Sequence, residues 1–169
     1  MRKVTMIFQD FENFLLTEEC FDNHDVSVID KDGLQHYLNI NNEDYMAYLA
    51  VISLELGVWG NTIKVEQIEK WFDYNDRTAH AFYNQMNSGT FSVHTDPVDV
   101  LIECLDGRKY MEVEGKEIVL EPHDTLLIPA NTEHRALNKE KALMISYGIH
   151  DTETLNGLRE DDRDLQSRL

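Results

Sequence analysis

The chain has 169 residues, of which 42% are hydrophobic and 28% are charged, as is usual for a single soluble globular domain. Its 32 acidic and 15 basic side chains leave a net charge of -17, which disfavours direct binding to the phosphate backbone of nucleic acids. Two cysteines far apart and no long apolar segment disfavour a disulfide scaffold, a secretory leader and a membrane span, so we expect a cytoplasmic protein.

The first half of the chain has apolar residues mainly at helical spacing. In residues 8–21 an apolar face contains Phe8, Phe11, Phe14 and Leu15. Residues 41–57 are the clearest helix, with Asn42 as its N-cap and Gly57 at its end. Its predicted apolar stripe is Tyr45, Leu49, Ile52 and Leu56. A third helix is predicted in residues 64–74 from the spacing of Val65, Ile68, Trp71 and Phe72.

Residues 25–40 interrupt this helical pattern and predict a hairpin or short strands around Lys31-Asp32-Gly33. Near residue 78 the pattern changes to short strands. We therefore expect an N-terminal helical extension, residues 1–78, packed on a barrel formed by residues 79–150. A charged tail, residues 151–169, follows within the same globular domain.

The second half predicts a mainly β fold. Apolar runs in residues 99–105, 125–128 and 143–149 are bounded by turn residues, and residues 109–120 form two alternating segments joined at Glu114-Gly115. Short strands at intervals of about ten residues are typical of a β sandwich or barrel.

A candidate metal site lies in this second half. His94 and Asp96 are two residues apart, so on a strand both side chains project from one face. His134 opens a later strand after the turn at Pro129, and closure of a barrel would bring it beside the pair. Two imidazoles and one carboxylate form the facial set of ligands found in non-haem Fe(II) oxygenases.

These residues resemble the motifs of the cupin superfamily, a small jelly-roll (double-stranded β-helix) barrel. The first cupin motif, a HxH or HxD pair followed by a turn glycine, matches His94, Asp96 and Gly107. The second motif matches at Pro129, His134 and Asn138, with His123 and Asn131 in place of its two glycines. Because asparagine tolerates a positive φ angle, Asn131 is a mild change, whereas His123 is expected to alter its turn.

The absence of a carboxylate at Val100, where many cupins have a further ligand, leaves an HxD…H set. This set resembles the JmjC-type, cupin-like branch of the Fe(II)/2-oxoglutarate oxygenases. In several members of that branch a lysine fifteen residues after the first ligand pairs with the far carboxylate of 2-oxoglutarate, and Lys109 stands at that distance from His94. Asp99 is expected to be structural, because at three residues from Asp96 it does not share the ligand face.

Further residues are candidates for the pocket. Tyr83 and Asn84 lie just before the metal-binding segment, and Asn138 ends the second motif. His80, His123 and His150 are more typical of structural or surface histidines than of ligands or acid–base groups.

Three functions remain open. The first is an Fe(II)/2-oxoglutarate-dependent dioxygenase that hydroxylates a small-molecule or peptide substrate, with His94, Asp96 and His134 as ligands and Lys109 as the 2-oxoglutarate anchor. The second is a cupin metalloenzyme that acts on a small molecule without 2-oxoglutarate. The third is a non-catalytic cupin that binds a ligand or forms a homodimer. Mn, Co, Ni or Zn would also suit the ligand set.

Overall fold

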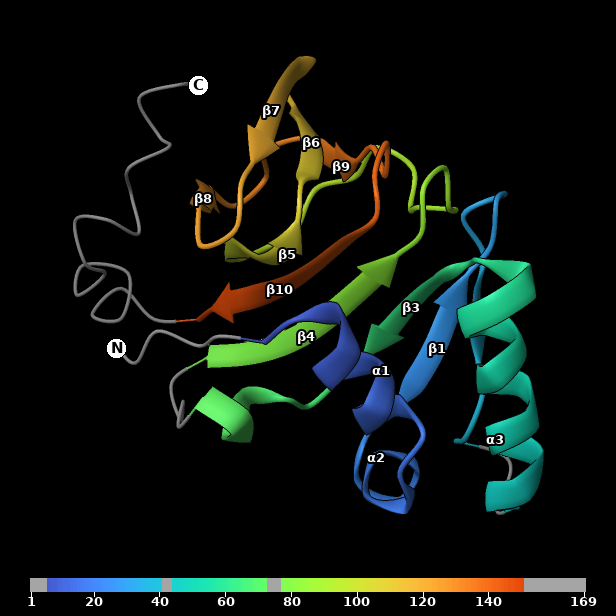
Figure 1. Cartoon of the computed structure of the whole chain (residues 1–169). Coiled ribbons are helices and arrows are strands. Elements are labelled where there is room, and N and C mark those ends of the chain that lie inside the picture. Colours follow the sequence, from blue (N-terminus) through green and yellow to red (C-terminus); the bar gives the residue numbers. More distant parts are fainter. Residues whose placement is uncertain (1–5, 41–43, 73–76, 151–169) are drawn as a thin grey trace.

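Two antiparallel sheets organise the chain in the computed structural model, which describes residues 6–40, 44–72 and 77–150. The large sheet has the strand order β2-β1-β3-β4-β10-β5-β8, and the small sheet has the order β7-β6-β9 (Figure 1). The strands are β1 Val26–Ile29, β2 Gln35–Tyr37, β3 Thr62–Val65, β4 Arg77–Asn84, β5 Asp99–Gly107, β6 Lys109–Val113, β7 Lys116–Leu120, β8 Thr125–Ile128, β9 His134–Ala136 and β10 Ala142–Ile149. The helices are α1 Phe8–Leu15, α2 Glu18–Asn23 and α3 Tyr45–Leu54, with a π-helical turn at Glu55–Trp59 and a 3-10 turn at Glu69–Phe72.

The predicted mainly β barrel is confirmed. The predicted apolar runs form β5, β8 and β10, and the hairpin predicted at Glu114-Gly115 joins β6 to β7. Both turn residues have positive φ angles, 49° and 78°, which suit the right-handed twist of a two-residue hairpin.

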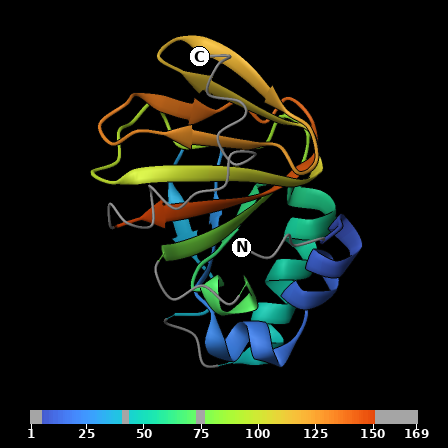
Figure 2. The same cartoon turned by 90° about the vertical axis from the view of Figure 1, so that its left-hand side faces the viewer.

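The large sheet has a separate apolar core on each face. On one face it packs against the helices, and on the other it packs against β6 and β7 of the small sheet (Figure 2). Strand alternation assigns residues to the two cores: in β4, Ala79, Ala81 and Tyr83 are fully buried in the core that the helices cover. The opposite face of β4 therefore turns towards the interior of the barrel.

The helical face predicted for the first segment is confirmed. Phe11 and Leu15 of α1 are fully buried, and Phe8 and Phe14 pack against the same core. The chain then turns into α2, which begins after Thr17, whose hydroxyl oxygen accepts a hydrogen bond from the backbone N–H of Cys20. This N-cap separates α2 from α1, so that the predicted single segment forms two short helices.

The helix α3 differs in detail from its prediction. Asp44 is its N-cap and accepts hydrogen bonds from the backbone N–H groups of Met46 and Ala47, whereas Asn42 lies outside the described residues. The chain continues through the π-helical turn past Gly57, and Gly60 ends it with φ 63°. Gly57 is therefore not the end.

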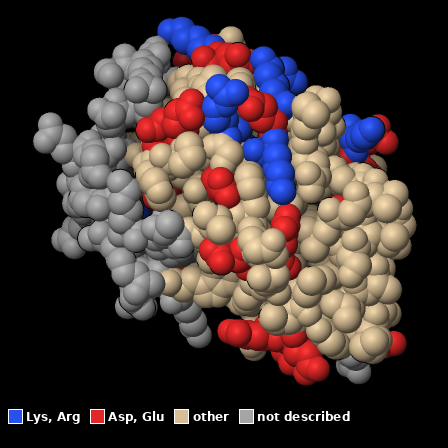
Figure 3. All heavy atoms as spheres, viewed as in Figure 1, with Lys and Arg blue, Asp and Glu red and all other residues tan. Residues whose placement is uncertain are grey.

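The buried face of α3 also differs from the predicted stripe. Tyr48, outside that stripe, is fully buried, whereas Tyr45 and Leu49 are partly buried. The helix is apolar on all sides, and the surface over it is largely free of charge in Figure 3, so periodicity could not select the inner face.

The helix predicted over residues 64–74 is wrong for its first part. Thr62–Val65 form β3, which pairs with β1 on one side and β4 on the other. Ile63 and Val65 are fully buried under the helices, an alternation of period two that outweighs the helical spacing of Val65, Ile68 and Trp71. The predicted hairpin in residues 25–40 is confirmed as β1 and β2.

The segment assigned to a helical extension thus adds β1, β2 and β3 to the large sheet. The division of the chain at residue 78 stays a prediction, and the predicted tail, residues 151–169, lies outside the described residues. Among the described helices, none has the length and apolar character needed to cross a membrane.

Candidate metal centre

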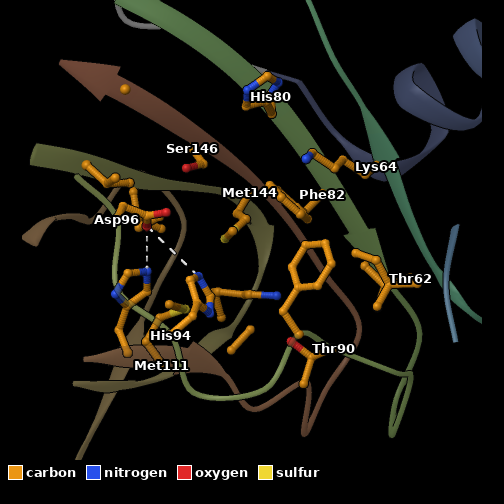
Figure 4. Close-up of a pocket in the computed structure, with 18 of the residues that line it drawn as sticks. Thr62, Lys64, His80, Phe82, Thr90, His94, Asp96, Met111, Met144 and Ser146 are labelled. Atoms are coloured by element: carbon orange, nitrogen blue, oxygen red, sulfur yellow. Dashed lines mark ion pairs between the residues drawn. The ribbon is translucent and has the colours of Figure 1, made fainter. Parts of the chain in front are cut away.

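A cavity of about 290 Å³ lies between the two sheets, inside the barrel. The large sheet contributes residues of β3, β4, β5 and β10 to its wall, and the small sheet contributes residues of β6 and β9. The loop that contains His94 and Asp96 closes one side (Figure 4). A barrel interior of this size suits a small organic ligand.

The structure brings His94, Asp96 and His134 together at the cavity wall. The Nε2 atom of His134 lies 3.0 Å from Oδ2 of Asp96, and Nε2 of His94 lies 3.9 Å from the same oxygen. One ligand atom from each of the three residues falls within 4.8 Å of the others, so the group could hold a metal ion. His134 is 6% exposed, whereas the side chains of His94 and Asp96 are 38% and 37% exposed.

The backbone pairs the two histidines directly. The N–H of His94 donates to the carbonyl of His134 at 3.1 Å, and the N–H of His134 donates back at 2.9 Å. This isolated antiparallel bridge places the two ring centroids 4.5 Å apart. We expected a strand at His94, but only this one residue forms a β-bridge. His94 and Asp96 therefore project together from a loop.

Each imidazole is oriented in the same way by a carbonyl two residues earlier. Nδ1 of His94 lies 2.8 Å from the carbonyl oxygen of Ser92, and Nδ1 of His134 lies 2.8 Å from that of Thr132. A carbonyl only accepts, so each Nδ1 carries a proton and each ring turns its Nε2 towards Asp96. Nitrogen atoms directed at a carboxylate in this way suit a cation between them, either a metal ion or a proton.

The loop of Asp96 is attached to the turn before His134. The carbonyl of Asp96 accepts from the N–H of Asn131 at 2.8 Å, and Oδ1 of Asp99 accepts from the N–H of Ala130 at 2.7 Å. Asn131 has the positive φ angle, 62°, that its place in the motif requires. Asp99 thus fills the structural role expected of it.

Lys109 lies on the cavity and is 1% exposed. Its Nζ donates to the side-chain oxygens of Asn84 at 3.0 Å and Asn138 at 2.7 Å. Burial lowers the pKa of Lys109 to about 7. An ammonium has three hydrogens to donate, and among the described residues two acceptors are present, so one donor remains for a ligand.

The other predicted pocket residues separate into two groups. Asn138 lines the cavity, and Asn84 supports Lys109 from behind the wall. Tyr83 does not line the cavity, which corrects the prediction: its ring stacks on Phe11 under the helices, and its hydroxyl donates to Glu12. Adjacent residues of a strand face opposite sides, so Tyr83 and Asn84 could not share one pocket.

The three other histidines considered in the sequence analysis occupy different places relative to the cavity. His80 and His150 line the cavity, whereas His123 does not. His123 takes φ 75°, so the turn keeps the conformation that glycine would favour. The expected change in this turn is therefore not found.

Thr62 and Lys64 of β3 also line the cavity, and the sequence analysis did not predict this. Their alternation with Ile63 and Val65 was the signal for a strand.

A comparison with protein families matches the part of the chain that contains His94, Asp96 and His134. Residues 77–147 match a family model described as a cupin domain. A search of curated proteins gave no significant match.

Solved structures also match, at low identity. An RmlC-like cupin from Shewanella frigidimarina is 16% identical, with 58% of this chain and 84% of that chain covered and a TM-score of 0.45. KdgF from a Halomonas species is 17% identical, with 55% and 83% covered and a TM-score of 0.42. The DMSP lyase DddQ from Ruegeria pomeroyi is 18% identical, with 47% and 41% covered and a TM-score of 0.41.

Proposed function

We propose that residues 77–147, which match the family model of a cupin domain, form a cupin barrel, and that the protein is a metal-dependent enzyme acting on a small organic molecule held in this barrel. His94, Asp96 and His134 would hold a divalent cation at the wall of the cavity. One observation carries the proposal: both imidazoles have Nδ1 on a backbone carbonyl and Nε2 directed to the same carboxylate oxygen. Such outer contacts are the usual means of orienting metal-ligating histidines.

The cation would polarise oxygen atoms of a bound substrate and, if it is Fe(II), would also support chemistry with dioxygen. The chain itself would bind the substrate and exclude water. Phe82, Val100, Met111 and Met144 supply apolar wall around the centre. Since water is displaced by these side chains, the polar contacts inside the cavity are stronger than they would be in solution.

The more specific proposal is an Fe(II)/2-oxoglutarate-dependent dioxygenase. It is supported by Lys109, which presents a buried amine to the cavity and has one donor left for a ligand. A carboxylate at this donor would stabilise the ammonium form, whose pKa burial otherwise lowers. Lys109 would hold the carboxylate that is remote from the metal.

Elemental analysis of the purified, tag-free protein tests the metal proposal. We expect about one equivalent of iron, manganese, cobalt, nickel or zinc per chain after loading. Asp96→Asn and His134→Ala should lose it, because each removes one of the converging ligand atoms. His36→Gln is the matched control, since His36 pairs with Asp30 on the surface, away from the cavity. Retention of the metal by the two ligand variants would show that the cation binds elsewhere.

Succinate formation from 2-oxoglutarate with Fe(II) and oxygen tests the specific proposal. The wild type should form succinate, and Lys109→Met should form at least ten times less. Lys139→Met, which changes an exposed lysine paired with Glu117, should match the wild type. A metal-loaded wild type that forms no succinate would rule out 2-oxoglutarate chemistry and leave the metalloenzyme without it. A wild type that cannot be loaded at all would support a non-catalytic binding protein.

A further inference from the structure

Basic side chains outnumber acidic ones on the wall of the cavity, although the molecule as a whole is acidic. The chain has a net charge of -17. Among the described residues that line the cavity, however, Lys64 and Lys109 are basic, four are histidines, and Asp96 is the single carboxylate. If Asp96 serves the cation, the two lysines face the ligand without acidic partners on the wall. An interior of this kind selects anions.

Lys64 reaches the cavity from β3, outside the region that matches the cupin model. The strand is fixed by pairing on both sides, with Lys64 opposite Ser27 of β1 and opposite Phe82 of β4. Figure 4 shows Lys64 and His80 on the wall across from His94 and Asp96, with the amine of Lys64 directed into the cavity. A rigid central strand therefore holds this charge in place.

Among the described residues, no hydrogen bond satisfies the ammonium of Lys64. Its side chain is 15% exposed, and its Nζ forms an ion pair with the carboxylate of Glu66 at 3.8 Å, beyond hydrogen-bond distance. Its Nζ lies 5.6 Å and 5.8 Å from the ring centroids of Phe82 and Phe91. An ammonium withdrawn from water in this way is stabilised by an anionic partner.

His80 of β4 adds a second polar group that lacks a partner among the described residues, and like Lys64 of β3 it lines the cavity. Its Nδ1 is buried and, among the described residues, has no hydrogen-bond partner. Burial and then the charge of Lys64 lower the pKa of His80, so the ring is neutral near pH 7. A neutral imidazole can carry its proton on Nδ1 and donate it to a ligand oxygen.

We propose that Lys64 and His80 bind the acidic group of the substrate, so that the substrate is a small organic anion lying between the metal centre and the β3–β4 wall. This inference rests on the proposed function, whose cation would hold the other end of the molecule. The substrate class is then selected by a residue that the N-terminal part contributes to the barrel. A carboxylate and a phosphate share the required chemistry, and the test separates them.

Calorimetric titration with succinate, and separately with inorganic phosphate, tests the site on the full chain at low ionic strength. We expect binding of at least one of these anions, with the preferred probe identifying the group. Lys64→Met keeps the aliphatic stem and should weaken binding at least tenfold. Glu66→Gln removes the competing carboxylate and should strengthen binding a few-fold. Lys139→Met is the exposed-lysine control and should bind as the wild type does.

Three results would overturn the inference: no binding of either anion by the wild type, equal binding by Lys64→Met, or loss of binding only in Lys109→Met. The last result would place the anion at Lys109. Metal content of the same samples reports on the proposed function separately. A tenfold loss in Lys64→Met in protein that never takes up metal would support the anion site and reject the metalloenzyme.

Discussion

Single side chains in this protein carry strain and charge that the surrounding barrel tolerates. His123 and Asn131 both take positive φ angles, 75° and 62°, at the two positions where the cupin motif has glycine. A non-glycine residue in this conformation is destabilised by a clash of its Cβ with the backbone, and asparagine is affected less than histidine. The buried Nδ1 of His123, which has no partner among the described residues, adds to the cost.

His123→Gly should therefore stabilise the fold by about 1 kcal/mol, because relief of the backbone clash exceeds the added flexibility of the unfolded chain. Thermal unfolding should show a rise in Tm of roughly 2–4 °C. Asn131→Gly is the comparison and should give a smaller gain. A Tm of His123→Gly that does not exceed that of the wild type would mean that the turn carries no strain at His123.

Lys109 makes the stability of the protein depend on pH. Its pKa is about 7 in the folded chain and about 10.5 when unfolded, so between these values the unfolded chain binds more protons. The penalty for burying the ammonium is complete below about pH 7. It disappears as the pH rises to about 10.5.

Relative to Lys109→Met, the wild type should gain stability between pH 7 and pH 10.5, by on the order of 4 kcal/mol in total. Urea unfolding of both proteins across this range measures the difference, in which the titration of all other groups cancels. The loss of the hydrogen bonds to Asn84 and Asn138 in the variant is a constant offset. A difference that does not change with pH would show that the lysine is charged in the fold throughout.

At the scale of elements, the site depends on two loops held together by a few hydrogen bonds. Asp99 begins β5 and accepts the N–H of Ala130, in the turn that leads from β8 to His134. In the same turn, the backbone N–H of Asn131 donates a hydrogen bond to the carbonyl of Asp96. Asp99 is thus a positioning residue for two of the three proposed ligands.

Asp99→Ala should weaken metal binding about 10- to 100-fold, as loss of an outer contact generally does, without removing a ligand. Competition with a chelator measures the affinity. Asp99→Asn retains the accepting Oδ1 and should restore binding to near the wild-type level. If the asparagine variant is as weak as the alanine variant, the negative charge of Asp99 matters and the hydrogen bond does not.

At the scale of the whole molecule, repulsion between acidic side chains opposes folding. The 32 acidic residues exceed the 15 basic ones by 17. Surface ion pairs such as Arg108–Glu140 and Arg135–Glu112 offset little of this, since exposed pairs contribute about 0–1 kcal/mol each. The long-range repulsion therefore outweighs the attraction within these pairs.

Raising the salt concentration from 20 mM to 0.5 M should raise Tm by a few degrees, because it shortens the screening length below about 10 Å and weakens the repulsion. The measurement is made in chelator, so that metal binding does not contribute. Sodium chloride and potassium chloride should act equally. A fall in Tm with salt would mean that the ion pairs dominate.

The sequence predicted most of the barrel because its strands carry local signals. The run before Gly107, the Glu114-Gly115 turn and the spacing of Pro129, His134 and Asn138 each act over a few residues. Such patterns report the backbone conformation directly. The strand β3 was missed because its pairing with β1 and β4 is a tertiary interaction, and helical spacing in the same residues competed with it.

For the candidate site, the sequence by itself determined the residue types: two imidazoles, a carboxylate and a lysine at characteristic spacings. Tertiary structure alone decided that His94 pairs with His134, that Tyr83 turns away under the helices, and that Lys64 enters the cavity. Local sequence constrains the backbone over a few residues. Which side chains meet inside a barrel depends on sheet register and closure, and these are set by contacts between segments far apart in the chain.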